Sequence, residues 1–310
     1  MPQKNISVGV DIGGTHITCG AVLIREGRLL QETLSRQTFD HTAAPQPILQ
    51  SWAAALNASL EKIEPDHLAG IGFAIPGPFD YRSGTSKMQH KFKNLYGLHI
   101  PSALQPLLKI KSDLPMRFLN DAASFAAGEA WLGKGRGFDR VVVITLGTGF
   151  GSAFIEHGAP VVDRPDVPKE GCLWHLPFRD GIADEYFSTG WFAREYEKRT
   201  GEKISGVKDL AERAAAEVRI QKLFADFGRN LAECLAPPLR LFGAETLVVG
   251  GNIAHALPLF EADLKDGLKQ SGVDMPIQVS ELEENAALIG SARLLDNKFW
   301  ERVSAHLPNI

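Results

Sequence analysis

The sequence predicts an α/β fold in two domains, and three observations support this prediction. The chain has 310 residues, 44% of them hydrophobic and 23% charged, which is enough to fill two ordinary cores. A β-branched strand that runs into a glycine-rich turn occurs twice, at residues 6–15 and 140–149. After each copy, helical and strand-like segments alternate, which is typical of an α/β domain.

The first copy begins an expected domain at residues 1–118. Its turn Gly13-Gly14-Thr15 separates two strands, and a later strand ends in Pro76-Gly77-Pro78. The predicted strands are 6–11, 17–24, 70–74 and 116–119, and the predicted helix is 47–61; a further helix is predicted to begin near Ala122, just after the expected boundary.

The second copy belongs to an expected domain at residues 119–289. Strands are predicted at 140–145, 151–155 and 246–249, and a helix at 221–235, where apolar residues recur at helical spacing. We expect the last segment, 290–310, to cross back and complete the first domain.

Composition excludes several classes of function. The net charge is −4 and no run of lysine and arginine is present, so we expect no nucleic-acid partner. No apolar stretch is long enough to cross a bilayer, and the N-terminal residues run directly into a strand without room for a secretion signal. Cys19, Cys172 and Cys234 are scattered, which is typical of a reducing compartment, and we therefore expect a cytoplasmic protein.

The turn Gly13-Gly14-Thr15 predicts a site for phosphate. Glycines lack Cβ atoms, so backbone N–H groups can converge on phosphate oxygens. Asp11 lies just before the turn, and a carboxylate beside phosphates suits Mg²⁺, which takes carboxylates, phosphates and water. The alternative interpretation is a tight hairpin with a polar tip.

Two further glycine segments strengthen this interpretation. Gly147-Thr148-Gly149 lies in the same strand-turn-strand setting and could bind the other end of a nucleotide's phosphate chain. Gly250-Gly251 follows a buried-looking strand and precedes a helix, where α/β folds bind ligands. Taken alone, the second segment could be a plain strand-to-helix connection.

Asn120 and Asp121 stand between an apolar strand and a helix. Either residue could simply cap that helix. Beside phosphate-binding turns, however, a carboxylate at this place predicts a general base, because phosphoryl transfer to a hydroxyl needs a group that orients the hydroxyl and accepts its proton.

The motifs together resemble the ROK family of sugar kinases and sugar-responsive repressors. The resemblance runs from about residue 6 to about residue 292, and it rests on segments that occur in the family's order. These segments are Asp11 to Thr15, Gly72 to Pro78, Asn120-Asp121 with Gly128-Glu129, Thr145 to Gly149, and Val249-Gly250-Gly251. The resemblance implies two actin-like (ribonuclease H-like) ATPase domains with a cleft between them, ATP and Mg²⁺ as cofactors, a sugar substrate and a homodimer.

The resemblance also implies roles for single residues. Asp121 matches the family's catalytic base and Asn120 its neighbour that binds sugar hydroxyls. The positions matching the family's phosphate loops are Gly13, Gly14, Thr15, Thr148 and Gly149, and Gly250 and Gly251 are further candidates for binding the nucleotide. Asp11 matches the acidic residue near Mg²⁺, reached through water. Pro76, Gly77 and Asn94 fall where similar kinases line the sugar pocket.

One segment departs from the family pattern. Many members have Gly-Glu-x-Gly-His followed by a cysteine-rich zinc cluster, whereas this chain has Gly171-Cys172-Leu173-Trp174-His175 and no such cluster, so we expect no structural zinc. His175 matches the family's sugar-binding histidine, although a packing role beside Trp174 is the alternative.

Two pairs of alternatives concern the sugar-binding carboxylates of this segment. Cys172 stands where a sugar-binding glutamate is usual, and Glu170 could replace that glutamate through a local shift. Asp184 is the candidate for the second sugar-binding carboxylate, with Glu185 as its competitor.

We therefore predict an ATP-dependent kinase that phosphorylates a hydroxyl of a hexose or hexose derivative. Two other functions stay open: a non-catalytic sugar-binding sensor on the same fold, and an actin-like ATPase that acts on protein partners. A repressor is not expected, because its DNA-binding winged helix would precede the first strand, where this chain begins.

Overall fold

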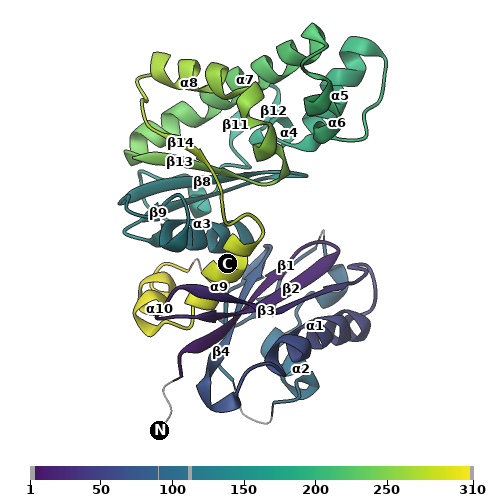
Figure 1. Cartoon of the computed structure of the whole chain (residues 1–310), viewed down its shortest axis with the longest axis vertical. Coiled ribbons are helices and arrows are strands. Elements are labelled where there is room, and N and C mark those ends of the chain that lie inside the picture. Colours follow the sequence, from purple (N-terminus) through teal and green to yellow (C-terminus); the bar gives the residue numbers. More distant parts are fainter. Residues whose placement is uncertain (1–3, 90, 111–113, 308–310) are drawn as a thin grey trace. The chain divides into compact units, whose positions relative to one another are not determined.

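The computed structural model describes residues 4–89, 91–110 and 114–307, and the chain forms two compact units (Figure 1). Unit 1 contains the chain up to Leu132 together with the segment from Glu284 onward. Unit 2 contains Gly133–Glu283. Each unit has its own five-stranded sheet, so each can be described separately.

The sheet of unit 1 has the strand order β3-β2-β1-β4-β7. Its strands are β1 (Ile6–Ile12), β2 (His16–Leu23), β3 (Arg28–Thr38), β4 (Leu68–Ile75) and β7 (Met116–Asn120). β2 is antiparallel to β1 and β3, whereas β4 and β7 run parallel to β1. The four strands predicted in this half are confirmed.

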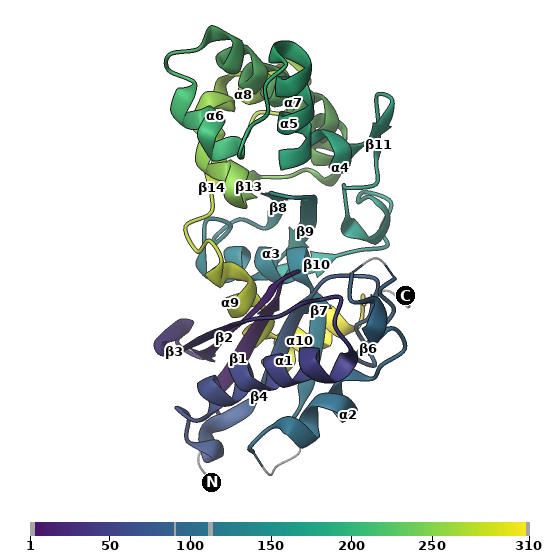
Figure 2. The same ribbon diagram turned by 90° about the vertical axis from the view of Figure 1, so that its right-hand side faces the viewer.

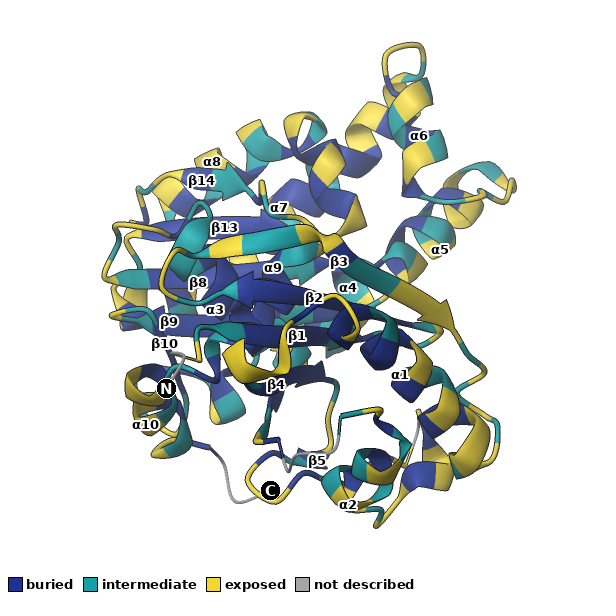
Figure 3. Ribbon diagram, turned by 60° about the horizontal axis from the view of Figure 1, so that its bottom comes forward, coloured by how far each residue is buried: buried dark blue, intermediate teal, exposed yellow. Residues whose placement is uncertain are grey.

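The fifth strand, β3, was not predicted. Its sequence is mostly polar, and most of its residues are exposed or partly exposed, in contrast to the buried β1 (Figure 3). An edge strand has only one neighbour and needs no continuous apolar pattern, which explains the missing signal.

Helices cover the sheet of unit 1. α1 (Pro45–Leu60) packs on β2 and β3, and α9 (Asn285–Arg293) packs on β1 and β4. α9 lies so close to the sheet that a Cβ atom at Gly72 would be 1.8 Å from the backbone oxygen of Ser291. Gly72 is therefore required by the contact between backbones. The smaller elements of this unit are η1 (Pro65–His67), β5 (Phe79–Asp80), β6 (Thr85–Ser86), η2 (Lys93–Leu95), α2 (Ile100–Leu104), η3 (Gln105–Leu107) and α10 (Asn297–Ser304).

Unit 1 differs in extent from the expected domain at 1–118 with 290–310. It also includes α3 (Asp121–Leu132) and all of α9, because these two helices pack closely on each other. A Cβ atom at Gly290 of α9 would be 1.8 Å from the backbone oxygen of Ser124 in α3. The sequence pattern could not reveal this pairing, since the two helices are far apart along the chain.

The sheet of unit 2 repeats the arrangement of the first, with the order β10-β9-β8-β13-β14 (Figure 2). Its strands are β8 (Arg140–Leu146), β9 (Phe150–Glu156), β10 (Ala159–Val161), β13 (Thr246–Gly250) and β14 (Ile277–Val279). β9 is antiparallel to β8 and β10, and β13 and β14 run parallel to β8. The predicted use of one strand-turn-strand motif twice is thus confirmed, and the repeat extends to all five strands of each sheet, including β10 and β14, which were not predicted.

The main helix of unit 2 is longer than predicted. α7 spans Val218–Phe242, whereas the pattern gave 221–235, because Pro237 and Pro238 signal a helix end but here lie inside the helix. Its buried face includes Phe224 and Phe227 in the aromatic core of the unit. No helix in the described part of the chain has the length and apolar content needed to cross a membrane. The other elements are η4 (Lys169–Gly171), β11 (Pro177–Phe178), β12 (Gly181–Ile182), α4 (Ala183–Tyr186), α5 (Thr189–Thr200), α6 (Val207–Arg213), η5 (Asn252–Leu259) and α8 (Glu261–Gln270).

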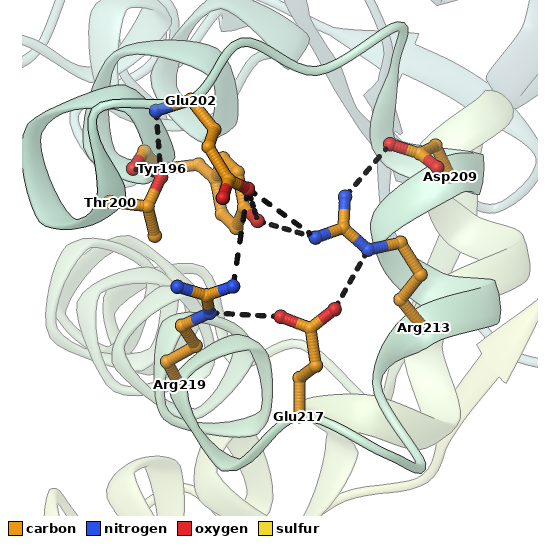
Figure 4. A network of polar contacts seen from close by, with 7 residues as sticks. All are labelled: Tyr196, Thr200, Glu202, Asp209, Arg213, Glu217 and Arg219. Atoms are coloured by element: carbon orange, nitrogen blue, oxygen red, sulfur yellow. Dashed lines mark hydrogen bonds and ion pairs between the residues drawn. The ribbon is translucent and has the colours of Figure 1, made fainter.

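A polar network joins α5, α6 and the start of α7 (Figure 4). The guanidinium of Arg213 donates to Glu217 Oε1 at 2.9 Å and to the Tyr196 hydroxyl at 2.5 Å. Arg219 donates to the other oxygen of Glu217, and its guanidinium also lies over the Tyr196 ring. The network fixes α6 to its neighbours through charged groups at the protein surface.

Candidate active site

The sheet of unit 1 brings its predicted site residues to one edge. Asp11 is the second-to-last residue of β1 and lies opposite Ala74 in the parallel pairing of β1 with β4. Asn120 is the last residue of β7 and lies opposite Ile75, the last residue of β4. Parallel strands present their carboxyl ends together, so Asp11, Asn120 and the turn after β4 share this edge.

Asp11 is partly buried and has a strongly altered acidity. Burial, together with the nearby carboxylates of Asp121 and Glu284, raises the pKa of Asp11 to about 7, while Arg36 opposes the shift. Arg36 and Glu284 form an ion pair at 3.3 Å. Neither residue was predicted as part of the site, because Arg36 lies on the unpredicted β3 and Glu284 is remote in sequence.

Asn120 and Asp121 make different contacts with the backbone of α3. Asn120 Oδ1 accepts a hydrogen bond from the Ala123 backbone N–H at 3.2 Å, so Asn120 caps α3. Asp121 Oδ1 accepts from the Ala122 N–H at 2.9 Å. Burial raises the pKa of Asp121, with the charge of Lys91 among the opposing effects. The Asp121 carboxylate is thereby held in place and made more basic.

Tyr81, which no pattern singled out, links two predicted parts of the sugar pocket. Its hydroxyl donates to the backbone oxygen of Ile75 at 3.2 Å, and Asn120 Nδ2 lies 3.4 Å from the same hydroxyl. A Cβ atom at Gly77 would be 3.3 Å from that hydroxyl oxygen. The turn of Pro76 and Gly77 is therefore coupled to Asn120 through the phenol.

Asn94 lies in η2 and is exposed. Its amide nitrogen donates to the backbone oxygens of Thr42 and Ala43, both at 2.9 Å. The side chain thus holds the loop that leads into α1, a contact that was not foreseen.

The two glycine turns have the same length, three residues between two antiparallel strands. In unit 1 the Gly13 N–H donates to the His16 backbone oxygen at 2.9 Å, and Thr15 is exposed. A Cβ atom at Gly14 would have no neighbour within 4 Å, and the same is true at Gly147 in unit 2. Each turn therefore has open space beside one glycine.

Gly250 and Gly251 lie beside the second turn. Gly250 ends β13 opposite Thr145 of β8. Gly251 has φ +81°, and a Cβ atom there would be 2.4 Å from the Leu146 backbone oxygen. Only glycine suits this position. The following η5 is a 3-10 helix.

The segment around His175 is tied to the second turn. Asp184 Oδ1 accepts from the Phe150 N–H at 2.6 Å, and the Asp184 N–H donates to the Trp174 backbone oxygen at 3.0 Å. Glu185, its competitor for the sugar role, accepts from the Ile182 N–H at 3.2 Å and so caps α4.

The structure also shows the contacts of Trp174 and Cys172 in that segment. Trp174 is 45% exposed, and its ring is edge-on to that of His175 at 5.3 Å. The Cys172 thiol donates a hydrogen bond to the Glu170 backbone oxygen at 3.3 Å, and both residues are partly buried.

The donors present suit Mg²⁺ better than a soft metal. Asp11 provides a hard oxygen donor beside an open glycine turn. Within the described ranges, no three His, Cys, Asp or Glu side chains are grouped as metal ligands. The expected absence of structural zinc stays a prediction.

Comparison with known proteins identifies the family. A model of the ROK family matches residues 7–163. The chain is 24% identical to the glucokinase of Thermotoga maritima over 96% of this chain and 99% of that protein. It is 28% identical to an N-acetyl-D-glucosamine kinase of Escherichia coli over 84% and 88% of the two chains.

A solved structure shares the fold. The ROK family glucokinase of Streptomyces griseus, in complex with glucose and AMPPNP, superposes with a TM-score of 0.71 at 23% identity, covering 93% of this chain and 98% of that one. The predicted actin-like architecture is confirmed by this likeness and by the repeated sheet order. The chain belongs to the ROK family.

Proposed function

We propose that this chain is an ATP-dependent sugar kinase that phosphorylates a hydroxyl of a hexose or hexose derivative, with Asp121 as general base. Its membership of the ROK family and its curated relatives, which are sugar kinases, support the reaction class. The observation that carries the assignment of the base is the partly buried Asp121 carboxylate at the start of α3, near enough to Asp11 to raise the pKa of that residue.

The proposed step is an in-line transfer. The attacking hydroxyl gives its proton to Asp121 while its oxygen bonds to the γ-phosphorus, and the bond from that phosphorus to the bridging oxygen of ADP breaks. The raised pKa of Asp121 favours the transfer, because a carboxylate of higher pKa is a stronger base when ionised. The hydrogen bond from the Ala122 N–H orients the carboxylate beforehand.

The glycine turns bind the nucleotide in this proposal. Gly13 lets the first turn form, backbone N–H groups at Gly14, Thr15, Thr148 and Gly149 donate to phosphate oxygens, and Gly250 and Gly251 lie beside the second turn. Asp11 would hold Mg²⁺ through water. When bound, the ion supplies positive charge that neutralises the phosphate oxygens.

The sugar is proposed to contact Asn120, Asn94, His175 and the turn of Pro76 and Gly77. Tyr81 supports this set by joining the turn to Asn120. A thiol at Cys172 cannot accept hydroxyl hydrogen bonds as a glutamate does, so the preferred sugar is expected to differ from that of family members that have the glutamate. The homodimer and the cytoplasmic location stay predictions.

The test is ADP production from Mg-ATP across a panel of monosaccharides that includes glucose, mannose, fructose and N-acetylglucosamine. A kinase produces ADP only with its substrate, and mass spectrometry then finds one sugar phosphate per ADP. ATP hydrolysis that ignores sugars would favour an ATPase acting on protein partners. Binding of a sugar without turnover would favour the sensor.

A further inference from the structure

Asp184 stands apart from the other predicted sugar contacts, because its carboxylate is bound to the second glycine turn. Oδ1 accepts the backbone N–H of Phe150 at 2.6 Å, a short charge-assisted bond. The same oxygen would lie 3.0 Å from a Cβ atom at Gly149, so the carboxylate occupies the space beside that glycine. Asp184 and Gly149 thus fit each other.

Three more bonds tie the same stretch of chain to the β8–β9 hairpin. The N–H and the hydroxyl of Thr189 both donate to the Gly147 backbone oxygen, at 2.7 and 3.0 Å. The Leu173 N–H donates to the buried Ser152 hydroxyl at 2.7 Å. The segment 173–189 therefore braces the turn on both sides, at Gly147 and at Phe150.

The backbone of Asp184 connects this brace to the segment that carries His175. Its N–H donates to the Trp174 oxygen at 3.0 Å. One residue therefore bonds through its side chain to the turn predicted to bind phosphate, and through its backbone to the residue beside the predicted sugar-binding histidine.

We propose that Asp184 is a positioning residue for the nucleotide: its carboxylate fixes the turn Gly147 to Phe150 in the conformation that binds phosphate. This inference rests on the proposed function. It differs from the sugar-binding role that the sequence suggested. Asp184 Oδ1 already accepts a hydrogen bond from the Phe150 N–H, so the carboxylate would affect binding by holding the turn in place. Because the Phe150 N–H donates to a charged carboxylate, loss of this hydrogen bond should weaken nucleotide affinity about tenfold or more.

The experiment compares Asp184→Ala with the wild-type chain in two equilibrium titrations, one with Mg-AMPPNP and one with the sugar that gives most turnover, glucose being tried first. We expect AMPPNP binding to weaken about tenfold and sugar binding by less than about threefold. Asp184→Asn keeps a carbonyl acceptor and should restore part of the affinity. Asp180→Asn is the matched control, because this nearby carboxylate binds the Tyr186 hydroxyl instead of the turn.

A second readout needs no ligand. Hydrogen exchange at the Phe150 amide should be at least about tenfold faster in Asp184→Ala, because its acceptor is gone, and unchanged in Asp180→Asn. If Asp184→Ala fails to fold, Thr189→Val removes one bond at Gly147 and should weaken AMPPNP binding in the same direction.

Several outcomes would overturn the inference: sugar binding lost with AMPPNP binding intact, AMPPNP binding unchanged, or unchanged exchange at Phe150. Failure of the proposed function is a different result. A wild-type chain that phosphorylates no sugar, yet binds AMPPNP with the expected dependence on Asp184, would refute the kinase and leave the positioning role supported.

Discussion

Asn in place of Asp11 should stabilise the ligand-free protein at alkaline pH. The pKa of Asp11 is raised from 3.8 to about 7, about three units, and each unit corresponds to about 1.4 kcal/mol. Ionised Asp11 therefore lowers the free energy of unfolding by up to about 4 kcal/mol at pH 8. This is an upper bound, because the side chain is only partly buried.

The sign of the effect follows from the raised pKa. Between pH 4 and pH 7 the unfolded chain releases the proton while the folded chain keeps it, so this contribution to stability is present at low pH and lost as pH rises through 7. Asp11→Asn cannot ionise. Its stability relative to the wild-type chain should therefore increase, by up to about 3 kcal/mol, from pH 4.5 to pH 8.

Thermal melts in buffer with a chelator and without nucleotide measure this difference, which corresponds to several degrees in Tm. Asp66→Asn is the matched control, because it makes the same chemical change at an exposed carboxylate of unit 1. Equal pH dependence of the Asp11→Asn and wild-type melts would refute the reasoning. A difference in stability between Asp11→Asn and the wild-type chain that becomes smaller toward pH 8 would also refute the reasoning.

Three further predictions concern other parts of the chain. Because burial raises the pKa of Asp121, kcat/KM should fall on the acid side at a pH above the ordinary carboxyl range, as a pH-rate profile will show. Gly72→Ala places a Cβ atom 1.8 Å from the Ser291 backbone oxygen, so α9 must move. Denaturant unfolding should show that the free energy of unfolding falls by about 3 kcal/mol or more. The control Gly206→Ala should change it little, because the space beside Gly206 is open. Arg213→Lys removes the forked contacts to Glu217 and Tyr196, and should raise hydrogen exchange in α6 with a small drop in Tm.

Much of the fold could be predicted because strong patterns lie in buried strands. β1, β4 and β8 are apolar runs bounded by glycine or proline, and the repeated turn showed the duplication. The edge strand β3 and the continuation of α7 through its prolines had no such signal. Pairing of α3 with α9 depends on glycine contacts between segments that are distant in sequence.

The candidate site could be predicted only in part, for a similar reason. Glycine turns and the Asn120-Asp121 pair leave local patterns that a single stretch of sequence reveals. Tyr81 and Arg36 do not, because Arg36 is brought to the site by the pairing of β3 with β2, and Tyr81 by a hydrogen bond from the end of β5 back to Ile75. Likewise, the sequence could place Asp184 near His175 but could not show that its carboxylate bonds to Phe150.

The most direct test of the general base is single-turnover phosphoryl transfer by Asp121→Asn with its best sugar substrate. Asparagine has nearly the same shape but cannot take the proton, so the rate should fall about 100-fold or more while AMPPNP and sugar affinities change little. Asp66→Asn should keep the wild-type rate. Transfer by Asp121→Asn within about threefold of the wild-type rate would contradict the assignment of Asp121 as general base.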